Sequence, residues 1–324
     1  MAMEQSQVDN NNAEERDEQQ DVRPRGLQEG EETKDRDFGS SGTARRAATA
    51  SLESMASAFC HTDVLPVLLP LVQHKLQSDN WHAQESAVLA LGVVAHGCLQ
   101  GLVQFLPDVL GLLLRLLGAS QPLLRSISCW CVSRYSHWIC NEQNPNGEEI
   151  LRRVYASLLQ RLLDGNKHVQ EAANGALATL LMETNSRPLP FLDVIVETLV
   201  RALQCYQAKN LLVLCDTIGT LAVVVGKGLA DDKYVKVLLP PLAQRLDGLG
   251  PDDYLVAPFE CLAALAFAFG PSFSSMVPQL VQRCMRLIHN GSLAGKHWQK
   301  RPTEFDKPNR VLICTSIDLL AAIV

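Results

Sequence analysis

Aromatic residues are scarce in this chain, and their scarcity limits the folds open to it. Only 6% of the 324 residues are Phe, Trp or Tyr, whereas 47% are hydrophobic, with Leu, Ala and Val dominating. This composition suits helices better than sheets. The alternation of apolar and polar residues that marks strands is also missing from every segment. We therefore expect an all-α protein.

The sequence also lacks the motifs of enzymes and metal sites. No HExxH, GxSxG or glycine-rich phosphate loop occurs, and the eight histidines are scattered. Ser133 and His137 lie four residues apart, but no third group is present to orient them. The ten cysteines form no CxxC pair, and Cys129 and Cys131 are too close for a zinc knuckle. We expect no enzymatic activity, no metal and no cofactor, with reduced cysteines in the core of an intracellular protein.

Charge is low and unevenly distributed. Charged residues make up 20% of the chain, and the formal net charge is −6. Residues 1–40 carry twelve acidic and five basic side chains, a net charge of −7, which leaves +1 for the rest. A nearly neutral body argues against direct binding of nucleic acid. No apolar run reaches the ~18 residues of a membrane span without polar interruption, so we expect no membrane contact.

Two regions differ sharply in composition. Residues 1–43 are rich in Gln, Asn, Asp and Glu, have little to bury, and are expected to be disordered. Such an arm is usually a solubilising tail; the alternative is that it competes for a basic ligand held by the folded body. Residues 44–324 have a helical pattern. The expected helices cover 44–59, 64–77, 81–98, 103–117, 121–140, 147–164, 167–184, 188–207, 209–227, 232–246, 253–269, 273–289 and 307–324, with residues 296–310 as a basic polar connection.

The helical region repeats with a period of roughly 40 residues, which with two helices per unit is typical of HEAT repeats. An apolar residue followed by proline near a helix start recurs about once per period, except that one interval, from Pro107 to Pro190, spans two periods. Proline in a first turn costs little and fixes the start of the helix. We expect a solenoid of about six to seven helix pairs. The prolines are Pro66, Pro107, Pro190, Pro240 and Pro278.

The stretch Ile127–Trp138 is the most distinctive helix of the array. Read as one helix, it places Ile127, Trp130, Arg134 and Trp138 in a single stripe. The stripe is either a core face with one snorkelling arginine or an exposed aromatic platform that binds a ligand.

Other second helices carry small residues and isolated carboxylates on matching stripes. This pattern is expected of a groove for an extended, basic, partly aromatic peptide. Each acid also has a plainer interpretation: Glu53 lies on a solvated face, Glu171 complements a helix dipole, and Asp216 is a buried hydrogen-bonding group.

At these residues the chain resembles the transportin, or karyopherin-β2, family of nuclear import receptors. The resemblance extends from about residue 44 to the end and covers only the central and C-terminal part of the family's chain. It implies a HEAT superhelix that carries cargo through the nuclear pore and binds disordered, basic signals ending in R/H/K-x(2–5)-P-Y. The segments that carry it are WHAQESAVLALGVVAHGCLQGLVQFLPD (81–108), LLRSISCWCVSRYSHW (123–138), LLDGNKHVQEAANGALATL (162–180) and YQAKNLLVLCDTIGTLA (206–222).

The resemblance also implies which residues bind the signal. Glu53 stands where the family has an aspartate, which keeps a carboxylate for the tyrosine hydroxyl, and Met182 stands where the family has a glutamate. The implied proline–tyrosine pocket consists of Ala50, Glu53, Leu89, Ile127 and Trp130, with Arg134 beside it. The implied subsite for the arginine of the signal consists of Glu171, Thr179 and Asp216, with Ala172 adjacent, and Asp318 meets the upstream basic part.

The implied partners are cargo proteins and, with them, nuclear pore proteins, in a protein that shuttles between cytoplasm and nucleus. The family also binds the GTPase Ran, but the N-terminal arch that does so has no counterpart here. The acidic segment 1–40 stands where the family has a long acidic loop that helps to eject cargo. The alternative is a HEAT scaffold without transport activity that holds folded partners along its ridge. A scaffold of that kind predicts charged ladders and no exposed tryptophan.

Overall fold

The computed structural model describes residues 41–59, 61–141, 147–184, 189–247, 255–304 and 307–323. The predicted disordered segment 1–43 lies outside these ranges except for its last three residues, which begin a helix. All regular elements of the described ranges are helices, so the all-α prediction is confirmed. The chain divides into two compact units, residues 1–176 and 177–324, which we describe separately.

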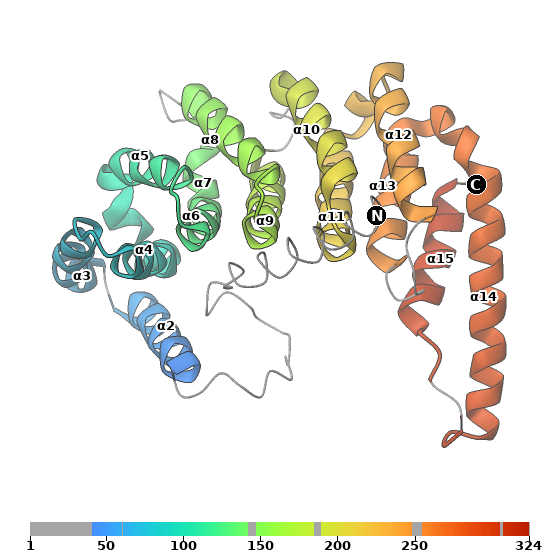
Figure 1. The fold of residues 1–324 in the computed structure, drawn as a ribbon, viewed down its shortest axis with the longest axis horizontal. Helices are drawn as coiled ribbons and strands as arrows, with labels where there is room; N and C mark the ends of the chain where they lie inside the picture. Colours follow the sequence, from blue (N-terminus) through green and yellow to red (C-terminus); the bar gives the residue numbers. More distant parts are fainter. Residues whose placement is uncertain are drawn as a thin grey trace, which may run out of the picture. The chain divides into compact units, whose positions relative to one another are not determined.

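The first unit contains helix pairs packed in sequence order. Helix α3 packs against α4 and α5 against α6, while α2, α4 and α6 lie side by side as successive second helices (Figure 1). This is the arrangement expected of HEAT repeats. The helices are α2 (Ser41–Ala58), α3 (His61–Leu76), α4 (Trp81–Leu102), α5 (Leu106–Leu116), α6 (Pro122–Arg134), α7 (Ser136–Ile139), α8 (Gly147–Leu162) and the first part of α9 (Lys167–Thr184).

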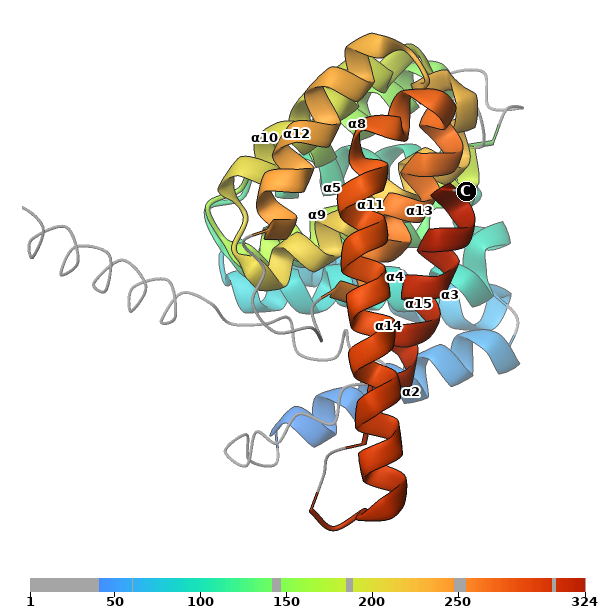
Figure 2. The same ribbon diagram turned by 90° about the vertical axis from the view of Figure 1, so that its right-hand side faces the viewer.

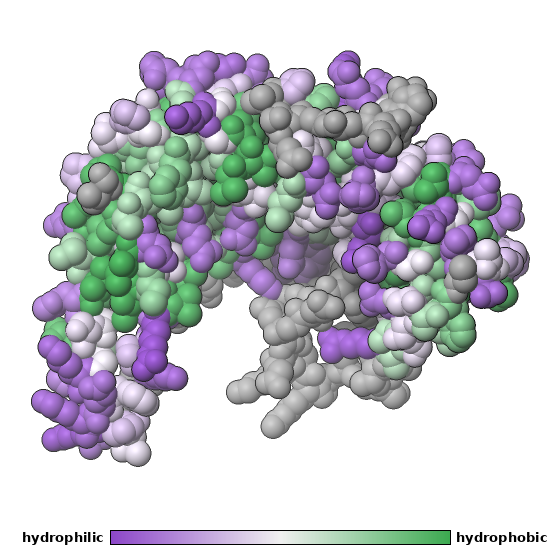
Figure 3. All heavy atoms as spheres, turned by 180° about the vertical axis from the view of Figure 1, so that it is seen from behind, coloured by the Kyte–Doolittle hydropathy of each residue, from purple (hydrophilic) through white to green (hydrophobic). Residues whose placement is uncertain are grey.

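The second unit continues the same pairing. Helix α10 packs against α11 and α12, α14 packs against α15, and α13 lies between α11 and α15. The helices are α10 (Leu192–Cys205), α11 (Ala208–Val225), α12 (Asp232–Asp247), α13 (Val256–Phe269), α14 (Val277–Lys300) and α15 (Arg310–Ile323). The far end of α14 extends well past α15 (Figure 2). Hydrophilic side chains cover this projecting end (Figure 3).

Polar contacts between successive repeats confirm the repeat period within each unit. Arg45 of α2 pairs with buried Glu85 of α4, 40 residues on. Arg125 of α6 pairs with Asp164, 39 residues on. In the second unit, Lys233 reaches Asp193 across 40 residues at 2.7 Å. Each contact joins one repeat to the next, so the repeats are connected by hydrogen bonds as well as by apolar packing.

The largest differences from the predicted boundaries lie in the stretch 121–140 and in α14. The stretch 121–140 is not one helix: it breaks at Tyr135 (φ −105°, ψ 11°) into α6 and α7. The break turns the Tyr135 side chain into the core, where its hydroxyl donates to the Leu91 carbonyl at 2.7 Å. Trp138 therefore lies on α7 and does not continue the stripe of α6. Helix α14 runs to Lys300, so residues 296–300, predicted as part of a loop, are helical.

The repeating prolines do not all lie at helix starts. Pro107 and Pro278 lie in the first turn of α5 and α14, as expected. Pro66 of α3 and Pro240 of α12 instead lie inside their helices, which begin at His61 and at Asp232.

By length and composition alone, the prediction that the chain has no apolar run long enough to span a membrane is wrong. Three stretches are long and apolar enough to cross a membrane by length and composition only: Trp81–Leu116, Lys209–Leu229 and Val256–Lys300. In the structure, 56%, 39% and 50% of their most apolar windows are buried inside the protein. Burial against neighbouring repeats is one reason for HEAT helices to be this apolar.

Candidate functional site: the surface of helices α2, α4 and α6

Trp130 and Arg134 lie one turn apart on α6, next to α4. The Trp130 indole packs directly over Gly92 of α4, since a Cβ atom added at Gly92 would lie only 2.2 Å from Cζ3 of the ring. Glycine at this position therefore allows the ring to approach the α4 backbone closely. Trp130 remains partly exposed. The ring forms a ledge that contacts α4 and keeps part of its surface open.

Arg134 links three second helices from this ledge. Its guanidinium carbon lies 5.8 Å from the centre of the Trp130 ring, within the range of a cation–π contact. Its Nε donates to the Gly92 carbonyl of α4 at 3.3 Å. Its Nη2 lies 3.6 Å from Oε1 of Glu53 on α2. Arg134 is thus held by α4 and α2 as well as by Trp130 of its own helix.

The Glu53–Arg134 pair is loose and open to solvent. The side chains are 54% and 34% exposed, and 3.6 Å is longer than a charge-assisted hydrogen bond. Ala50, one turn before Glu53, is also exposed. A carboxylate in this position can accept a hydrogen bond from a ligand hydroxyl while keeping its contact with Arg134. The surface combines a carboxylate, a guanidinium and an indole, and we call these three side chains the Trp130 cluster.

Two of the residues expected in the pocket are buried. Ile127 is 0% exposed and Leu89 is 7% exposed. Ile127 lies on α6, which carries Trp130 and Arg134, and Leu89 lies on α4, against which the indole packs. Ile127 offers a ligand no surface in this conformation. Of the six residues predicted for this part of the site, Ala50, Glu53, Trp130 and Arg134 form the accessible surface.

The remaining predicted residues are spread over later helices. On the first turns of α9, Glu171 is half-buried with Oε2 3.7 Å from Nδ1 of His168, and Ala172 is half-buried beside it. Three others belong to the second unit. Thr179 is half-buried on α9, while Asp216 on α11 and Asp318 on α15 are exposed. Asp216 as a residue is exposed, so the plainer interpretation of a buried group does not hold. Partial desolvation of its carboxylate by neighbouring atoms, and secondly the nearby Glu260 carboxylate, still raises the pKa of Asp216.

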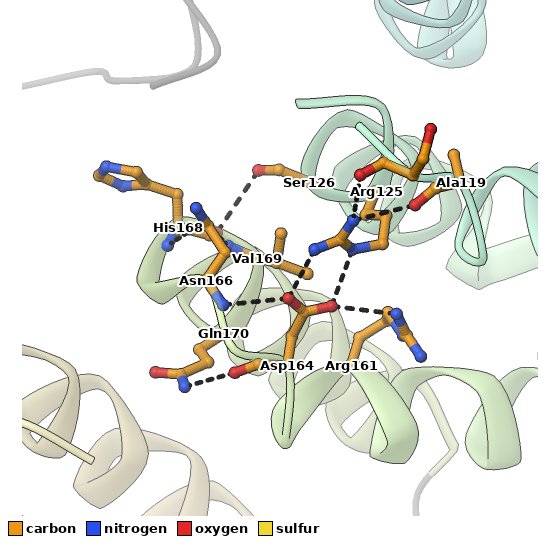
Figure 4. A network of polar contacts seen from close by, with 10 residues as sticks. Ala119, Arg125, Ser126, Arg161, Asp164, Asn166, His168, Val169 and Gln170 are labelled. Carbon is orange, nitrogen blue, oxygen red and sulfur yellow. Dashed lines mark hydrogen bonds and ion pairs between the residues drawn. The ribbon is translucent and has the colours of Figure 1, made fainter. Parts of the chain in front are cut away.

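A buried ion pair at the other end of α6 was missed by the sequence reasoning. Arg125 donates twice to Asp164, from Nε at 2.8 Å and from Nη2 at 2.7 Å (Figure 4). Arg161 and the backbone N–H of Asn166 also donate to this carboxylate, each at 3.0 Å. The side-chain oxygen of Asn166 in turn accepts from the backbone of the first turn of α9, which begins the helix. The network fastens α6 to the turn between α8 and α9. The separation of Arg125 and Asp164 by about one repeat was the available signal.

No group of His, Cys, Asp or Glu in the described ranges has the geometry to hold a metal ion. The nine described cysteines are free thiols, and seven of them are buried. Burial raises the pKa of Cys129 to about 12, so this thiol does not ionise near neutral pH. Cys60 lies outside the described residues.

Comparisons with known proteins agree with this architecture. Residues 81–135, which include α4, α6 and the Trp130 cluster except for Glu53, match the HEAT-like repeat family. Solved structures of the karyopherin Kap121p share the fold: the complex with the extreme C-terminus of the protein phosphatase Cdc14p has a TM-score of 0.72 at 19% identity, over 91% of this chain and 26% of that one. The complex with Nup53p has a TM-score of 0.70 over the same shares. The predicted HEAT array is confirmed.

Relatives in sequence show which HEAT-repeat proteins this chain is similar to. Transportin-1 of Oryza sativa subsp. japonica is 37% identical over 319 residues, which are 95% of this chain and 35% of that protein. Human transportin-1 is 37% identical over 280 residues, 86% of this chain and 31% of that protein. Importin subunit beta-2 of Schizosaccharomyces pombe is 36% identical over 86% of this chain and 31% of that protein.

The chain is a HEAT-repeat protein and a homologue of the transportins. It spans about one third of the length of the curated relatives it matches. These relatives carry the names of transport receptors, which agrees with the prediction that the chain is not an enzyme.

Proposed function

We propose that this chain is a cargo-binding segment of a nuclear import receptor that shuttles between cytoplasm and nucleus. In this proposal the Trp130 cluster binds the proline–tyrosine end of a basic nuclear localisation signal. The observation that carries the proposal is the Trp130 cluster itself, in which a partly exposed indole and a guanidinium on α6 lie beside an exposed carboxylate on α2. The homology to transportins over most of the chain supports the assignment.

The chemistry of the cluster fits this ligand. The proline and tyrosine rings can stack on the open part of the indole, and such stacking contributes about 1 kcal/mol beyond the burial of area. In this proposal the Glu53 carboxylate accepts a hydrogen bond from the tyrosine hydroxyl. Ordering a disordered signal costs about 2–5 kcal/mol or more, so tight binding requires additional subsites along the array. Glu171, Thr179, Asp216 and Asp318 are candidates for these subsites, where they would receive basic side chains, with Ala172 as a small neighbour.

The proposed partners are cargo proteins with basic proline–tyrosine signals and nuclear pore proteins. Kap121p, which shares the fold, has been solved with the C-terminus of Cdc14p, with Pho4p and with Nup53p. These complexes support the view that such an array holds peptide segments of cargo and pore proteins. We propose neither direct nucleic-acid binding nor a cofactor for this chain.

The test is fluorescence anisotropy of a labelled proline–tyrosine signal peptide titrated with the chain. Two changes should weaken binding roughly tenfold or more: tyrosine to alanine in the peptide, and Trp130→Ala in the protein. Trp81→Ala is the matched control, because Trp81 is also partly exposed, stacks on His82 and lies three turns before Gly92 on the same helix. Unchanged affinity in Trp130→Ala, or absence of binding by the folded chain, would refute the proposal and leave a HEAT scaffold.

A further inference from the structure

Helix α14 packs against the protein along one side. Leu280, Cys284 and Leu287 are buried on this inner side. On the same side, a Cβ atom added at Gly291 would lie only 2.6 Å from Cδ1 of Ile313 on α15, so glycine lets the two helices approach closely. The inner side therefore holds α14 in place and leaves the opposite side available for other contacts.

The opposite side of α14 is a single stripe of exposed residues. They follow one another at intervals of four and three residues, which keeps them on one face of a helix. The stripe contains no acidic side chain, and neither does the rest of this 24-residue helix. We call this stripe the basic face of α14, and its residues are Gln282, Arg286, His289, Leu293, Lys296 and Lys300.

The cations of the basic face lack carboxylate partners. Arg286, Lys296 and Lys300 form no ion pair within the part of the chain that the structure describes. Lys236 of α12, by contrast, lies 3.3 Å from Asp232, one turn earlier on its own helix. The helix dipole stabilises a cation in the last turn, such as Lys300, but Arg286 lies about four turns earlier. The dipole therefore does not explain the whole row of cations.

An exposed leucine lies in the middle of this row. Leu293 is 41% exposed and is seven residues from both Arg286 and Lys300. Seven residues of helix return to nearly the same face, so the three side chains form a line with the apolar one at its centre. At about 1.5 Å per residue, the line spans about 21 Å.

This pattern fits an acidic protein helix better than other anionic partners. A nucleic acid presents closely spaced phosphates and has no apolar side chain to cover Leu293. Binding to a membrane surface requires a broad apolar face, whereas α14 exposes two large hydrophobic residues, Leu293 and Met285. A helix lying alongside α14 has the same rise per residue, so its side chains return to the contact with the same seven-residue period.

We infer that the basic face of α14 binds an acidic helix of a partner protein. In that helix an apolar side chain lies against Leu293, and the carboxylates seven residues before and after it lie against Arg286 and Lys300. Lys296, one turn before Lys300, adds a further positive charge. The pattern is symmetric about the apolar residue, so either orientation of the partner gives the same contacts. The inference is independent of the proposed function, because it concerns a different face and a ligand of opposite charge.

The test is fluorescence anisotropy of labelled peptides titrated with the full chain at low ionic strength. The first peptide is an alanine-rich helix in which one leucine is flanked by glutamates seven residues before and after it. In the second peptide the leucine is moved by two residues, which turns it about 200° away from the glutamates. The wild-type chain should bind the first peptide roughly threefold to tenfold more tightly, as expected from partial burial of one leucine. Added salt should weaken the binding of both peptides.

Variants assign the binding to the basic face. Arg286→Glu combined with Lys296→Glu should weaken binding of the first peptide roughly tenfold or more, because two attractions become repulsions. Arg152→Glu combined with Lys236→Glu is the matched control, since it reverses two exposed cations on α8 and α12 and changes the net charge equally. In Leu293→Ser the two peptides should bind alike.

A second control addresses the apolar contact. Val67→Ser removes a 67% exposed valine from α3 and should leave the preference between the peptides unchanged. The inference is overturned if the wild-type chain binds neither peptide, does not distinguish them, or is weakened equally by the α14 reversal and its matched control. Tighter binding of a DNA duplex or of phosphatidylserine vesicles than of the first peptide would also overturn it. Loss of proline–tyrosine binding with these results intact would refute only the proposed function.

Discussion

The two ends of helix α6 use the same kind of ion pair for different purposes. Near its start, Arg125 is 13% exposed and makes two short hydrogen bonds to Asp164, which is 4% exposed. At its end, Arg134 is 34% exposed and approaches the 54% exposed Glu53 no closer than 3.6 Å. The first pair is shielded from water and makes short hydrogen bonds, whereas the second pair keeps donors and acceptors at the surface that a ligand can reach. Burial and geometry, not residue type, separate the structural pair from the pair that is free to meet a ligand.

The largest expected effect concerns the buried pair of Arg125 and Asp164 near the start of α6. Asp164→Ala leaves Arg125 and Arg161 without their shared carboxylate and removes the acceptor for the Asn166 N–H. Removing one partner of a buried pair typically costs about 3–5 kcal/mol, so the free energy of unfolding should fall by a similar amount. Urea denaturation followed by circular dichroism measures it. Glu53→Ala is the comparison variant and should cost less than about 1 kcal/mol. Equal losses in the two variants would erase the distinction between the two ends of α6.

The next effect concerns the glycine beneath the indole. In Gly92→Ala, the added methyl would overlap Cζ3 of Trp130 at 2.2 Å and displace the ring. Overpacking of this kind typically costs about 1–3 kcal/mol of stability, and signal-peptide affinity should fall as well because the ledge has moved. Gly175→Ala is the control, since a Cβ atom there would meet nothing within 4 Å. If Gly92→Ala binds and unfolds like the wild type, the ring does not depend on close contact with α4.

A smaller effect should come from the exposed arginine. Arg134→Lys keeps the charge but loses the planar group that reaches the indole, the Gly92 carbonyl and Glu53 together. We expect a change in stability below about 1 kcal/mol and a roughly threefold to tenfold loss of affinity for the signal peptide, measured by anisotropy. The reverse result, a large loss of stability with intact binding, would make Arg134 a structural residue like Arg125.

The smallest effect concerns Asp216, an exposed carboxylate that forms no ion pair with arginine in the part of the chain that the structure describes. Because the pKa of Asp216 is raised in the folded protein, the folded state holds that proton more tightly than the unfolded state. Stability should therefore rise as the pH is lowered from neutral towards the ordinary Asp value of 3.8. Asp216→Asn should lose this pH-dependent increment and gain less than about 0.5 kcal/mol at pH 7. Thermal unfolding of both proteins at several pH values measures it, and a variant less stable than the wild type at pH 7 would contradict it.

Much of the fold was predictable because it depends on local pattern. The repeat period and the helical periodicity predicted the HEAT array, and the contacts from Arg45 to Glu85 and from Arg125 to Asp164 follow the same period. The break at Tyr135 was not predictable, since it depends on the buried hydrogen bond from the Tyr135 hydroxyl to the Leu91 carbonyl. The extension of α14 to Lys300 was missed because its polar sequence lacks an apolar stripe.

The sequence predicted which residue types form the candidate site better than it predicted how exposed each residue is. The sequence pointed to Trp130, Arg134 and Glu53, and the structure brings these three together from α6 and α2. It did not reveal that Ile127 is fully buried or that Gly92 forms the seat of the indole. Both facts depend on how closely α4 and α6 approach, which is a property of packing between repeats.

The central claim is that Trp130 contacts the tyrosine of a cargo signal, and a double-mutant cycle tests it most directly. The affinities of wild-type and Trp130→Ala chains are measured by anisotropy for a proline–tyrosine peptide and for its tyrosine-to-alanine counterpart. Side chains in contact give non-additive effects, so the coupling energy should be about 0.5–3 kcal/mol, with little further loss when the second change follows the first. Additive losses, with a coupling energy near zero, would place the tyrosine elsewhere and contradict the account.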